Sequence, residues 1–239
     1  ATLPSADVPD YDRKQMRFMR NRRRQGKPYR DFESPVFTVP KSDGGHRLCT
    51  DYRALNRFQR KTPFKMEGVQ SVADMLQTGD YGMLVDLKDA YLTLGLHPSH
   101  RKYCRFYSPS GERLQWKTVS FGVAEAPRIC TKLMKPLIGI LKQLGVRCLI
   151  YIDDLLVVDQ DRARLCRAMA LAMELLQGEV GLQLKVTKCC FQPLQKFQCL
   201  GLIWDTTSMT VPVPSKRLKT TQRQAQQLLG AATSSDGTV

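Results

Sequence analysis

Residues 148–158 read C-L-I-Y-I-D-D-L-L-V-V, so two apolar runs flank the acidic pair Asp153 and Asp154. Short apolar runs on either side of turn-forming residues predict two buried strands joined by a hairpin. Neighbouring carboxylates at a hairpin tip repel each other and raise each other's pKa unless a cation offsets their charge. The pair is therefore either a solvent-exposed Asp-Asp turn or a site for a hard divalent ion such as Mg²⁺.

A further carboxylate ends an apolar run upstream, where residues 83–91 read M-L-V-D-L-K-D-A-Y. Asp86 follows the apolar residues, and an unpaired carboxylate is costly there unless it caps a following helix or binds a cation. Neighbouring strands of one sheet could bring Asp86, Asp153 and Asp154 to two Mg²⁺ ions about 3.5–4 Å apart. Two metal ions at this spacing stabilise the attacking and leaving oxygens of nucleotidyl transfer.

The composition indicates a folded and strongly basic protein. The 239 residues, 42% of them apolar, suffice for one or two domains, and 37 Lys and Arg against 22 Asp and Glu give a net charge of +15. A pI near 9.6 favours a polyanionic partner, nucleic acid first and an acidic membrane surface second. Because no apolar run reaches the roughly 20 residues that cross a bilayer, no membrane span is expected.

The N-terminus and the cysteines bear on the compartment. The chain starts A-T-L-P, without an initiator Met or the blocks of a signal peptide, which favours a piece of a longer polyprotein. None of the eight cysteines forms a C-x-x-C pair and only three His are present, so neither a zinc site nor a disulfide framework is expected. We therefore expect an intracellular location, in the cytoplasm or the nucleus.

Periodicity and turn residues predict an α+β fold, because hairpins alternate with amphipathic helices. Pro136 lies inside one predicted helix and is expected to kink or break it. Strands are predicted over residues 34–40, 46–51, 83–87, 102–106, 115–119, 184–186, 197–204 and 210–213, and helices over 69–77, 127–141, 161–177 and 215–230.

Two basic segments are candidates for phosphate contacts. Residues 13–30 carry nine Lys and Arg and no acid, and a second basic segment covers residues 215–223. Both are either solvated surface charge or contacts to a nucleic-acid backbone, where each neutralised phosphate releases a counterion. The residues expected to hold template and primer in this way include Arg20, Arg23, Lys216 and Arg217.

Five segments in order carry a resemblance to reverse transcriptases. Y-I-D-D at 151–154 and V-D-L-K-D-A-Y at 85–91 resemble motifs C and A of that family. Residues 34–56 are similar to its fingers hairpin and V-S-F-G-V-A-E-A-P-R at 119–128 to motif B, while residues 188–191 and 197–201 resemble motifs D and E. Within the family, residues 97–106 and 126–137 look most like DIRS-type retrotransposons, with gypsy-type elements next.

The resemblance implies a right-hand polymerase fold with an antiparallel palm sheet, flanking helices and an incomplete thumb. It divides the chain into a basic N-terminal segment (1–33), fingers (34–82), the motif A part of the palm (83–98), a connection (99–118), the palm with motifs B to E (119–204) and the start of a thumb with a tail (205–239).

The resemblance also assigns roles by motif position. Asp86, Asp153 and Asp154, with the Leu87 carbonyl, would bind two Mg²⁺ ions, with Mn²⁺ as an alternative, and Lys188 would be a general acid for pyrophosphate. Leu200 and Gly201 would position the primer end. The incoming dNTP would be held by Lys41, Arg47, the Asp89 and Ala90 amides, Tyr91 as a steric gate against a ribose 2′-OH, Phe121 and Gly122.

Other interpretations of these residues remain open at this point. Lys41 and Arg47 could be hairpin surface charge, Tyr91 a core aromatic and Lys188 a solvated side chain. The expected activity is RNA-directed DNA polymerisation, with an RNA template, a DNA primer, an RNA–DNA duplex and adjoining polyprotein domains as partners, and no membrane partner. The alternatives are a domesticated nucleic-acid-binding fold without catalysis and a metal-dependent nuclease.

Overall fold

The computed structural model describes residues 32–40, 45–60, 62–108 and 111–212, together with the backbone of residues 16–18. The chain forms two compact units. The first contains residues up to 66 and residues 87–137, and the second contains residues 67–86 and the chain from 138 onward. Among the described residues, no helix is both long and apolar enough to cross a bilayer.

The first unit contains a hairpin and a separate antiparallel sheet. Strands β2 (Val36–Pro40) and β3 (His46–Thr50) pair throughout their length, as the Lys41–Gly45 turn chemistry predicted. The other sheet has the order β1–β6–β5. Its strands are β1 (Met16–Phe18), β5 (Arg105–Tyr107) and β6 (Arg113–Trp116), and the short helices of this unit are α2 (Arg53–Asn56), η1 (Ala90–Thr93) and η2 (Arg101–Tyr103).

An aromatic core with satisfied polar groups holds the first unit together. Tyr52 and Trp116 are both 1% exposed, and burial of such large rings without a hydrogen-bond partner would be costly. The Tyr52 hydroxyl lies 2.8 Å from Ser120 Oγ, and Trp116 Nε1 donates to Thr50 Oγ1 at 3.1 Å. These bonds tie the end of β3 to the end of β6 and to the segment that follows it.

The second unit is built on a four-stranded antiparallel sheet in the order β7–β8–β4–β9. All four residues 155–158 are buried, because β8 is an internal strand that is covered on both faces. This double burial explains why the apolar run is continuous rather than alternating. The strands are β4 (Tyr81–Asp86), β7 (Arg147–Tyr151), β8 (Asp154–Asp159) and β9 (Cys190–Leu194).

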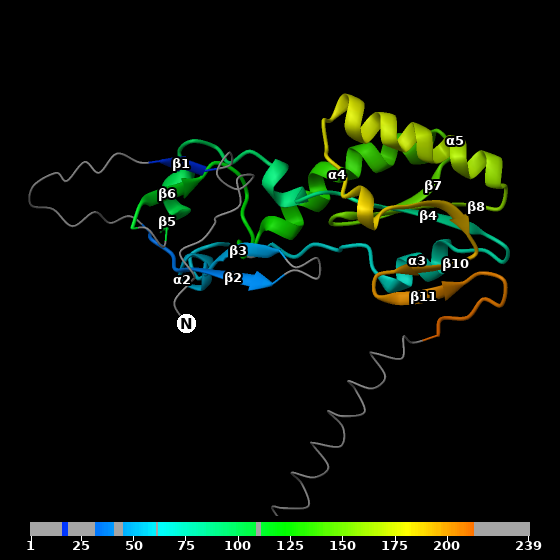
Figure 1. The fold of residues 1–239 in the computed structure, drawn as a ribbon, viewed down its shortest axis with the longest axis horizontal. Helices are drawn as coiled ribbons and strands as arrows, with labels where there is room; N and C mark the ends of the chain where they lie inside the picture. The colour runs from blue at the N-terminus through cyan, green and yellow to red at the C-terminus, as the bar shows by residue number, and fades with distance from the viewer. Residues whose placement is uncertain (1–15, 19–31, 41–44, 61, 109–110, 213–239) are drawn as a thin grey trace, which may run out of the picture. The chain divides into compact units, whose positions relative to one another are not determined.

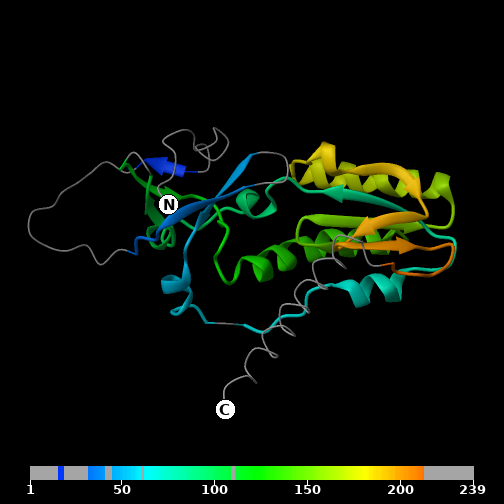
Figure 2. The same ribbon diagram turned by 60° about the horizontal axis from the view of Figure 1, so that its bottom comes forward.

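Helix α5 (Arg162–Met173) covers one face of this sheet, and α3 (Val69–Met75) covers the other together with the hairpin β10 (Lys196–Cys199) and β11 (Leu202–Asp205) (Figure 1). The predicted stripe of Leu165, Met169, Ala172 and Leu176 is buried, which confirms the amphipathic interpretation. The α-helix continues into a π-helical segment, η3 (Glu174–Glu179). Figure 2 shows α3 beside the β10–β11 hairpin.

A glycine lets the β10–β11 hairpin lie directly on the sheet. A Cβ on Gly82 of β4 would be 2.5 Å from the ring of Phe197, closer than any side chain tolerates. Phe197 is 4% exposed and packs with Val72, Leu156 and Trp204 in one apolar cluster. The small residue in β4 therefore decides how closely β10 approaches the sheet.

A buried ion pair joins the start of β4 to the start of β7. The Asp80 side chain is 0% exposed and accepts from Arg147 Nη1 at 2.9 Å and Nη2 at 2.5 Å. The amide of Gln77 also donates to Asp80 Oδ2 at 2.8 Å. The carboxylate raises the pKa of Arg147, first by its hydrogen bonds. Two-point pairing of this kind fixes the lateral position of the two strands.

Some sequence predictions of secondary structure were wrong. Lys102 and Tyr103 belong to η2, because amides 100, 103 and 104 bond to carbonyls three residues back, and the strand begins only at Arg105. Residues 184–186 form no strand, since the chain closes the 3₁₀ turn η4 (Val186–Lys188) there. The strand predicted over 115–119 ends at Trp116, and residue 118 makes only an isolated bridge.

Two longer predictions also needed correction. Helix α4 (Ala126–Gln143) continues through Pro136, so the predicted break does not occur, while a kink there stays a prediction; Met134, Ile138 and Leu141 around Pro136 are buried and hold the helix against its neighbours. The strand predicted over 197–204 is a hairpin instead, and residues 210–213 contribute one bridge at Thr210 among those described. The helix predicted over 215–230 lies outside the described residues. Of the basic segment 13–30, residues 16–18 form a strand.

Candidate active site

The acidic hairpin has a strained two-residue turn. Tyr151 of β7 pairs with Asp154 of β8, so Ile152 and Asp153 form the connection. Ile152 has a φ of 57°, in the left-handed region that a β-branched residue rarely adopts. Such a conformation costs about 1–3 kcal/mol and persists only where the surroundings enforce it. The buried strands on both sides supply that constraint and present Asp153 and Asp154 at the end of the sheet where β7 and β8 are joined.

Asp86 stands directly opposite Asp154 in the ladder between β4 and β8. Both backbone groups of Asp86 are used on its other side, since its carbonyl accepts from the Lys185 amide at 2.8 Å and its amide donates to Cys189 Sγ at 3.4 Å. The Asp86–Asp154 pair is therefore of the non-hydrogen-bonded kind, with Cα atoms about 4.5 Å apart and side chains close together. The ladder thus places two carboxylates side by side.

Burial and neighbouring carboxylates together raise the pKa of Asp154. The pKa of Asp154 is raised to about 6, first by burial and then by the nearby Asp153 and Asp86, while Lys188 opposes the shift. The Lys188 ammonium lies 3.4 Å from Asp86 Oδ2. The three predicted carboxylates therefore interact with one another, beside one lysine from the segment that resembles motif D.

The donor set suits a hard cation that also binds substrate. Within the described part of the chain, no three His, Cys, Asp or Glu side chains form a complete ligand group. Mg²⁺ does not require one, because it commonly takes one or two carboxylates and fills its remaining positions with water and substrate phosphates. Asp86 and Asp154 fit such an ion, because they face each other and the pKa of Asp154 is raised.

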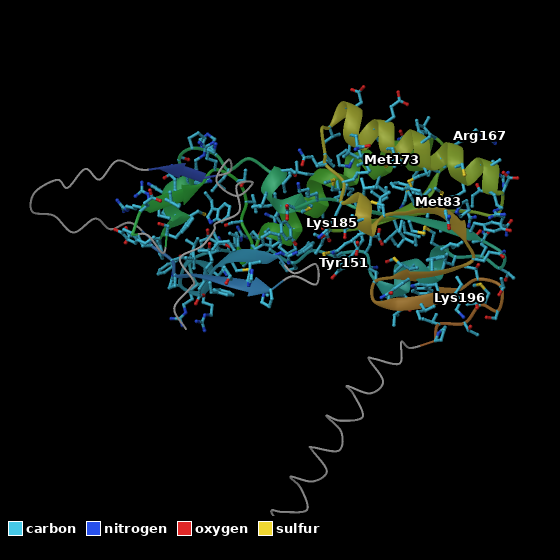
Figure 3. All side chains as sticks on the ribbon, in the orientation of Figure 1. Met83, Tyr151, Arg167, Met173, Lys185 and Lys196 are labelled. Carbon is cyan, nitrogen blue, oxygen red and sulfur yellow. The ribbon has the colours of Figure 1, made fainter. Side chains whose placement is uncertain are left out.

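The tip of the β10–β11 hairpin adjoins the carboxylates. Leu200 and Gly201 form its two-residue turn, with φ of 52° and 74°, as a type I′ connection requires. Cys199, Leu200 and Tyr151 belong to one apolar cluster, so the tip lies beside the acidic turn. The pKa of the Cys199 thiol is raised to about 12, first by burial and then by the Asp154 carboxylate. In Figure 3, Tyr151 and Lys185 lie at one end of the sheet and Lys196, at the start of β10, toward the other.

Three of the predicted nucleotide-binding side chains meet within the first unit. The Arg47 guanidinium lies 4.6 Å from the ring centre of Phe121, and Tyr91 meets the same ring edge-on at 5.4 Å. The backbone explains this meeting, because the Val119 amide donates to the Leu94 carbonyl at 2.8 Å. The segment after η1 therefore lies beside the segment that carries Phe121.

Gly122 is held in place by a residue to which the sequence assigned no role. It has a φ of 101°, and a Cβ there would lie 2.6 Å from the Thr50 carbonyl oxygen. Asn56 Nδ2 donates to the Gly122 carbonyl at 2.9 Å, while Asn56 Oδ1 accepts from the Ala124 amide at 3.0 Å. The sequence signal for this contact was the amide side chain of Asn56 at the end of α2, in the stretch that resembles the fingers hairpin. Its partner Gly122 lies 66 residues away, so the sequence did not indicate the contact.

The remaining predicted residues are placed as follows. Asp89 has a φ of 49° and its carbonyl accepts from the Leu92 amide at 2.8 Å, so it begins η1, and Leu87 and Ala90 are buried around it. The nucleotide and metal roles of these residues stay predictions. Lys41, Arg20, Arg23, Lys216 and Arg217 lie outside the described residues.

A row of aromatic rings on the first unit was not foreseen. Ring centres are 5.4 Å apart for Phe58 and Phe32, 6.2 Å for Phe32 and Tyr103, 6.5 Å for Tyr103 and His100, and 5.9 Å for His100 and His97. Phe58 is 77% exposed, and Tyr103 and both histidines are also exposed. The sequence signal was present in H-P-S-H-R-K-Y, but nothing local indicated that Phe32 and Phe58 join it.

Basic side chains accompany this aromatic row. Lys102 Nζ lies 5.0 Å from the ring centre of Tyr103, and Arg57 and Arg60 flank Phe58 and are exposed. Neither residues 52–66 nor residues 96–107 contain an Asp or Glu. Exposed rings interleaved with cations are typical of surfaces that bind single-stranded nucleic acid.

Comparisons with known proteins converge on one family. A model of the family described as "Reverse transcriptase (RNA-dependent DNA polymerase)" matches residues 39–204. The Gag-Pro-Pol polyprotein of squirrel monkey retrovirus is 28% identical over 213 residues, which is 83% of this chain and 11% of that protein. The Gag-Pol polyprotein of Rous sarcoma virus subgroup B (strain Schmidt-Ruppin) is 34% identical over 139 residues, which is 53% of this chain and 8% of that protein.

A solved structure shares the fold. The foamy viral protease-reverse transcriptase dRH in complex with ds DNA superposes with a TM-score of 0.70 at 16% identity, over 86% of this chain and 33% of that chain. The present chain spans only about a tenth of the length of the retroviral polyproteins it matches.

Proposed function

The chain belongs to the reverse transcriptase (RNA-dependent DNA polymerase) family, and on that premise we propose that it is the polymerase domain of a retroelement polyprotein. Its reaction is the attack of a primer 3′-OH on the α-phosphate of a dNTP, directed by an RNA template. The observation that carries the proposal is the pairing of Asp86 with Asp154, next to a turn that contains Asp153. DIRS-type or gypsy-type origin stays a prediction.

The metal role falls to the three carboxylates of the second unit and to the residue that follows Asp86 in the chain. Asp86, Asp153 and Asp154, with the Leu87 carbonyl, would hold two Mg²⁺ or Mn²⁺ ions. When bound, the ions would neutralise the charge that develops on the attacking and leaving oxygens. The raised pKa of Asp154 supports this role, because a partly buried carboxylate beside two others is stabilised by a shared cation.

The nucleotide role falls to residues of the first unit. Arg47 would neutralise the triphosphate together with Lys41, and the amides of Asp89 and Ala90 would donate to its oxygens. Tyr91 would stand beneath the sugar and reject a 2′-OH by steric contact. Phe121 supports these assignments, since its ring contacts both Arg47 and Tyr91, and Gly122 follows it in the turn.

The remaining roles concern the leaving group and the primer. Lys188 would donate a proton to pyrophosphate, and its ammonium 3.4 Å from Asp86 supports a position at the site. Leu200 and Gly201 would support the primer end, since Leu200 packs in the same apolar cluster as Tyr151, which precedes the acidic turn. Double-stranded DNA is bound in the foamy viral structure, and by analogy the partners here are a template, a primer and their duplex.

The test is primer extension by the chain on RNA and on DNA templates, with Mg²⁺ and with EDTA. We expect Mg²⁺-dependent extension on RNA that Asp154→Asn and Asp153→Asn each reduce by about 10³-fold or more, with duplex affinity within twofold of the parent protein. Asp205→Asn is the matched charge control, because Asp205 pairs with Lys196, which lies toward the opposite end of the sheet from Tyr151 (Figure 3).

Two other outcomes would replace the proposal. Duplex binding without extension under any divalent ion would favour a nucleic-acid-binding fold that has lost catalysis. Strand cleavage without added dNTP would favour a nuclease, and in that case Arg47 and Tyr91 would have no substrate to hold.

A further inference from the structure

The edge of β4 changes its partner just before the candidate active site. β9 pairs with β4 at Gly82 and Leu84, with an irregularity in register between the two. Regular pairing ends at the Leu84–Cys190 contact, two residues before Asp86. The chain opposite Asp86 is not a strand but the turn η4 with the residues on either side of it, Lys185 and Cys189.

This turn satisfies both backbone groups of Asp86. The Lys185 amide donates to the Asp86 carbonyl at 2.8 Å, as a strand would. The Asp86 amide, however, meets no carbonyl among the described residues and donates to Cys189 Sγ at 3.4 Å. The Cys189 thiol in turn has the Lys185 carbonyl at 3.5 Å and the Asp86 carbonyl at 3.9 Å as acceptors. The thiol therefore replaces one ladder hydrogen bond at the residue that bears a candidate metal ligand.

From these contacts we propose that Cys189 is a positioning residue for Asp86: its thiol anchors the Asp86 backbone and so fixes the direction in which the carboxylate faces Asp154. The inference rests on the proposed function only for its effect on catalysis. The backbone contact itself does not depend on the reaction.

The Cys189 sulfur accepts a hydrogen bond from the Asp86 amide across a longer distance than an oxygen acceptor normally spans. A sulfur atom accepts at longer range than oxygen, so it bridges the space left where β9 turns away. Without it, the Asp86 amide would lose its acceptor in a half-buried position, and the end of β4 would gain freedom to move. Groups that orient a metal ligand typically affect metal affinity or activity by about 10–100-fold.

The first experiment measures the contact without any turnover. Amide hydrogen exchange at Asp86 is followed in the parent chain and in Cys189→Ala, Cys189→Ser and Cys190→Ala. Cys190 is the matched control, because its thiol bonds to the Gln192 carbonyl at 3.6 Å and its side chain makes no described bond to Asp86. We expect exchange at Asp86 to accelerate about tenfold in Cys189→Ala, by a smaller factor in Cys189→Ser, whose hydroxyl has a shorter reach, and to stay near the parent rate in Cys190→Ala.

The second experiment measures the consequence for the ion. Mn²⁺ binding is titrated by electron paramagnetic resonance without nucleic acid, and kcat and the KM for dTTP are measured on a poly(rA) template with an oligo(dT) primer. In Cys189→Ala we expect Mn²⁺ affinity and kcat to fall about tenfold with KM within twofold of the parent, and Cys189→Ser to recover at least half of the loss on a logarithmic scale.

The results separate three cases. Unchanged exchange and Mn²⁺ affinity in Cys189→Ala would overturn the positioning role, as would an equal loss in Cys190→Ala. A loss accompanied by a lower Tm and weaker duplex binding in Cys189→Ala, without recovery in Cys189→Ser, would also overturn it in favour of general packing. Absence of extension by the parent chain would count against the proposed function alone, because the exchange and Mn²⁺ measurements would still decide the role of Cys189.

Discussion

Asp86 and Asp154 face each other as a non-hydrogen-bonded pair in neighbouring antiparallel strands, although 68 positions separate them in the sequence. Such a pair brings side chains closer than the hydrogen-bonded kind does. For two carboxylates the closeness is unfavourable unless a proton or a cation intervenes. The same relationship that suits the pair to metal binding therefore opposes the stability of the metal-free protein.

The first prediction concerns the pH dependence of stability without metal. The pKa of Asp154 is about 6 in the folded chain against 3.8 for an ordinary aspartate, so the folded state holds this proton more tightly. The stabilisation from the protonated form is complete below pH 3.8 and is lost as pH rises through 6. In EDTA at pH 7.5, Asp154→Asn should raise the free energy of unfolding by about 1 kcal/mol, because solvent screens part of the repulsion.

The measurement is urea unfolding between pH 4 and pH 8. The difference between Asp154→Asn and the parent should grow with pH over this range and shrink when Mg²⁺ is added. A difference that does not depend on pH would contradict the interpretation.

The second prediction concerns the Asp80–Arg147 pair. Asp80→Ala leaves a half-buried guanidinium without its carboxylate and should lower the free energy of unfolding of the second unit by about 3 kcal/mol. Trp204 is buried in this unit, so its fluorescence in a Trp116→Phe background reports the transition. The control is Lys196→Gln, whose surface pair with Asp205 should matter by less than about 1 kcal/mol. Equal effects in both variants would refute the structural role of the buried pair.

The third prediction concerns Gly122. A methyl group there would meet the Thr50 carbonyl at 2.6 Å in a backbone conformation that disfavours any side chain, so Gly122→Ala should destabilise the first unit by about 2 kcal/mol or more. Trp116 in a Trp204→Phe background reports that unit. Gly95→Ala serves as the control, because a Cβ there meets nothing within 4 Å. A Gly122→Ala chain as stable as Gly95→Ala would contradict the prediction.

The fourth prediction separates the ring of Tyr91 from its hydroxyl. If the ring excludes the 2′-OH, Tyr91→Ala should reduce the preference for dNTP over rNTP by about tenfold or more, while Tyr91→Phe should retain it. The quantity to compare is kcat/KM for dCTP and CTP on one template. Unchanged sugar discrimination in Tyr91→Ala would remove the gate role.

The fifth prediction concerns the exposed aromatic row. Stacking on one base contributes about 1–3 kcal/mol, so Phe58→Ala should weaken binding of a 12-nucleotide oligo(rU) about fivefold or more with little change in salt dependence. Lys102→Gln should reduce the salt dependence by about one phosphate contact. Tyr107→Phe, at an exposed residue outside the row, is the control in fluorescence anisotropy. Parent-like affinity in Phe58→Ala would contradict the prediction that the ring of Phe58 stacks on a base.

Local pattern was sufficient for much of the fold. The two apolar runs around Asp153 and Asp154 became β7 and β8, and the stripe of Leu165, Met169, Ala172 and Leu176 became the buried face of α5 and η3. Pattern failed where burial of neighbours overrode it, as at Pro136 in α4. It failed also where 3₁₀ turns replaced short strands, as at residues 184–186.

By itself the sequence determined the acidic hairpin, the strand that ends at Asp86 and the order of the segments that resemble reverse transcriptases, because these depend on residue type and spacing along the chain. Only the tertiary structure decided that Asp86 pairs with Asp154, that Asp80 binds Arg147, and that the Cys189 thiol meets the Asp86 amide. The physical reason is that strand register and edge partners are set by packing between distant segments, which no local periodicity encodes.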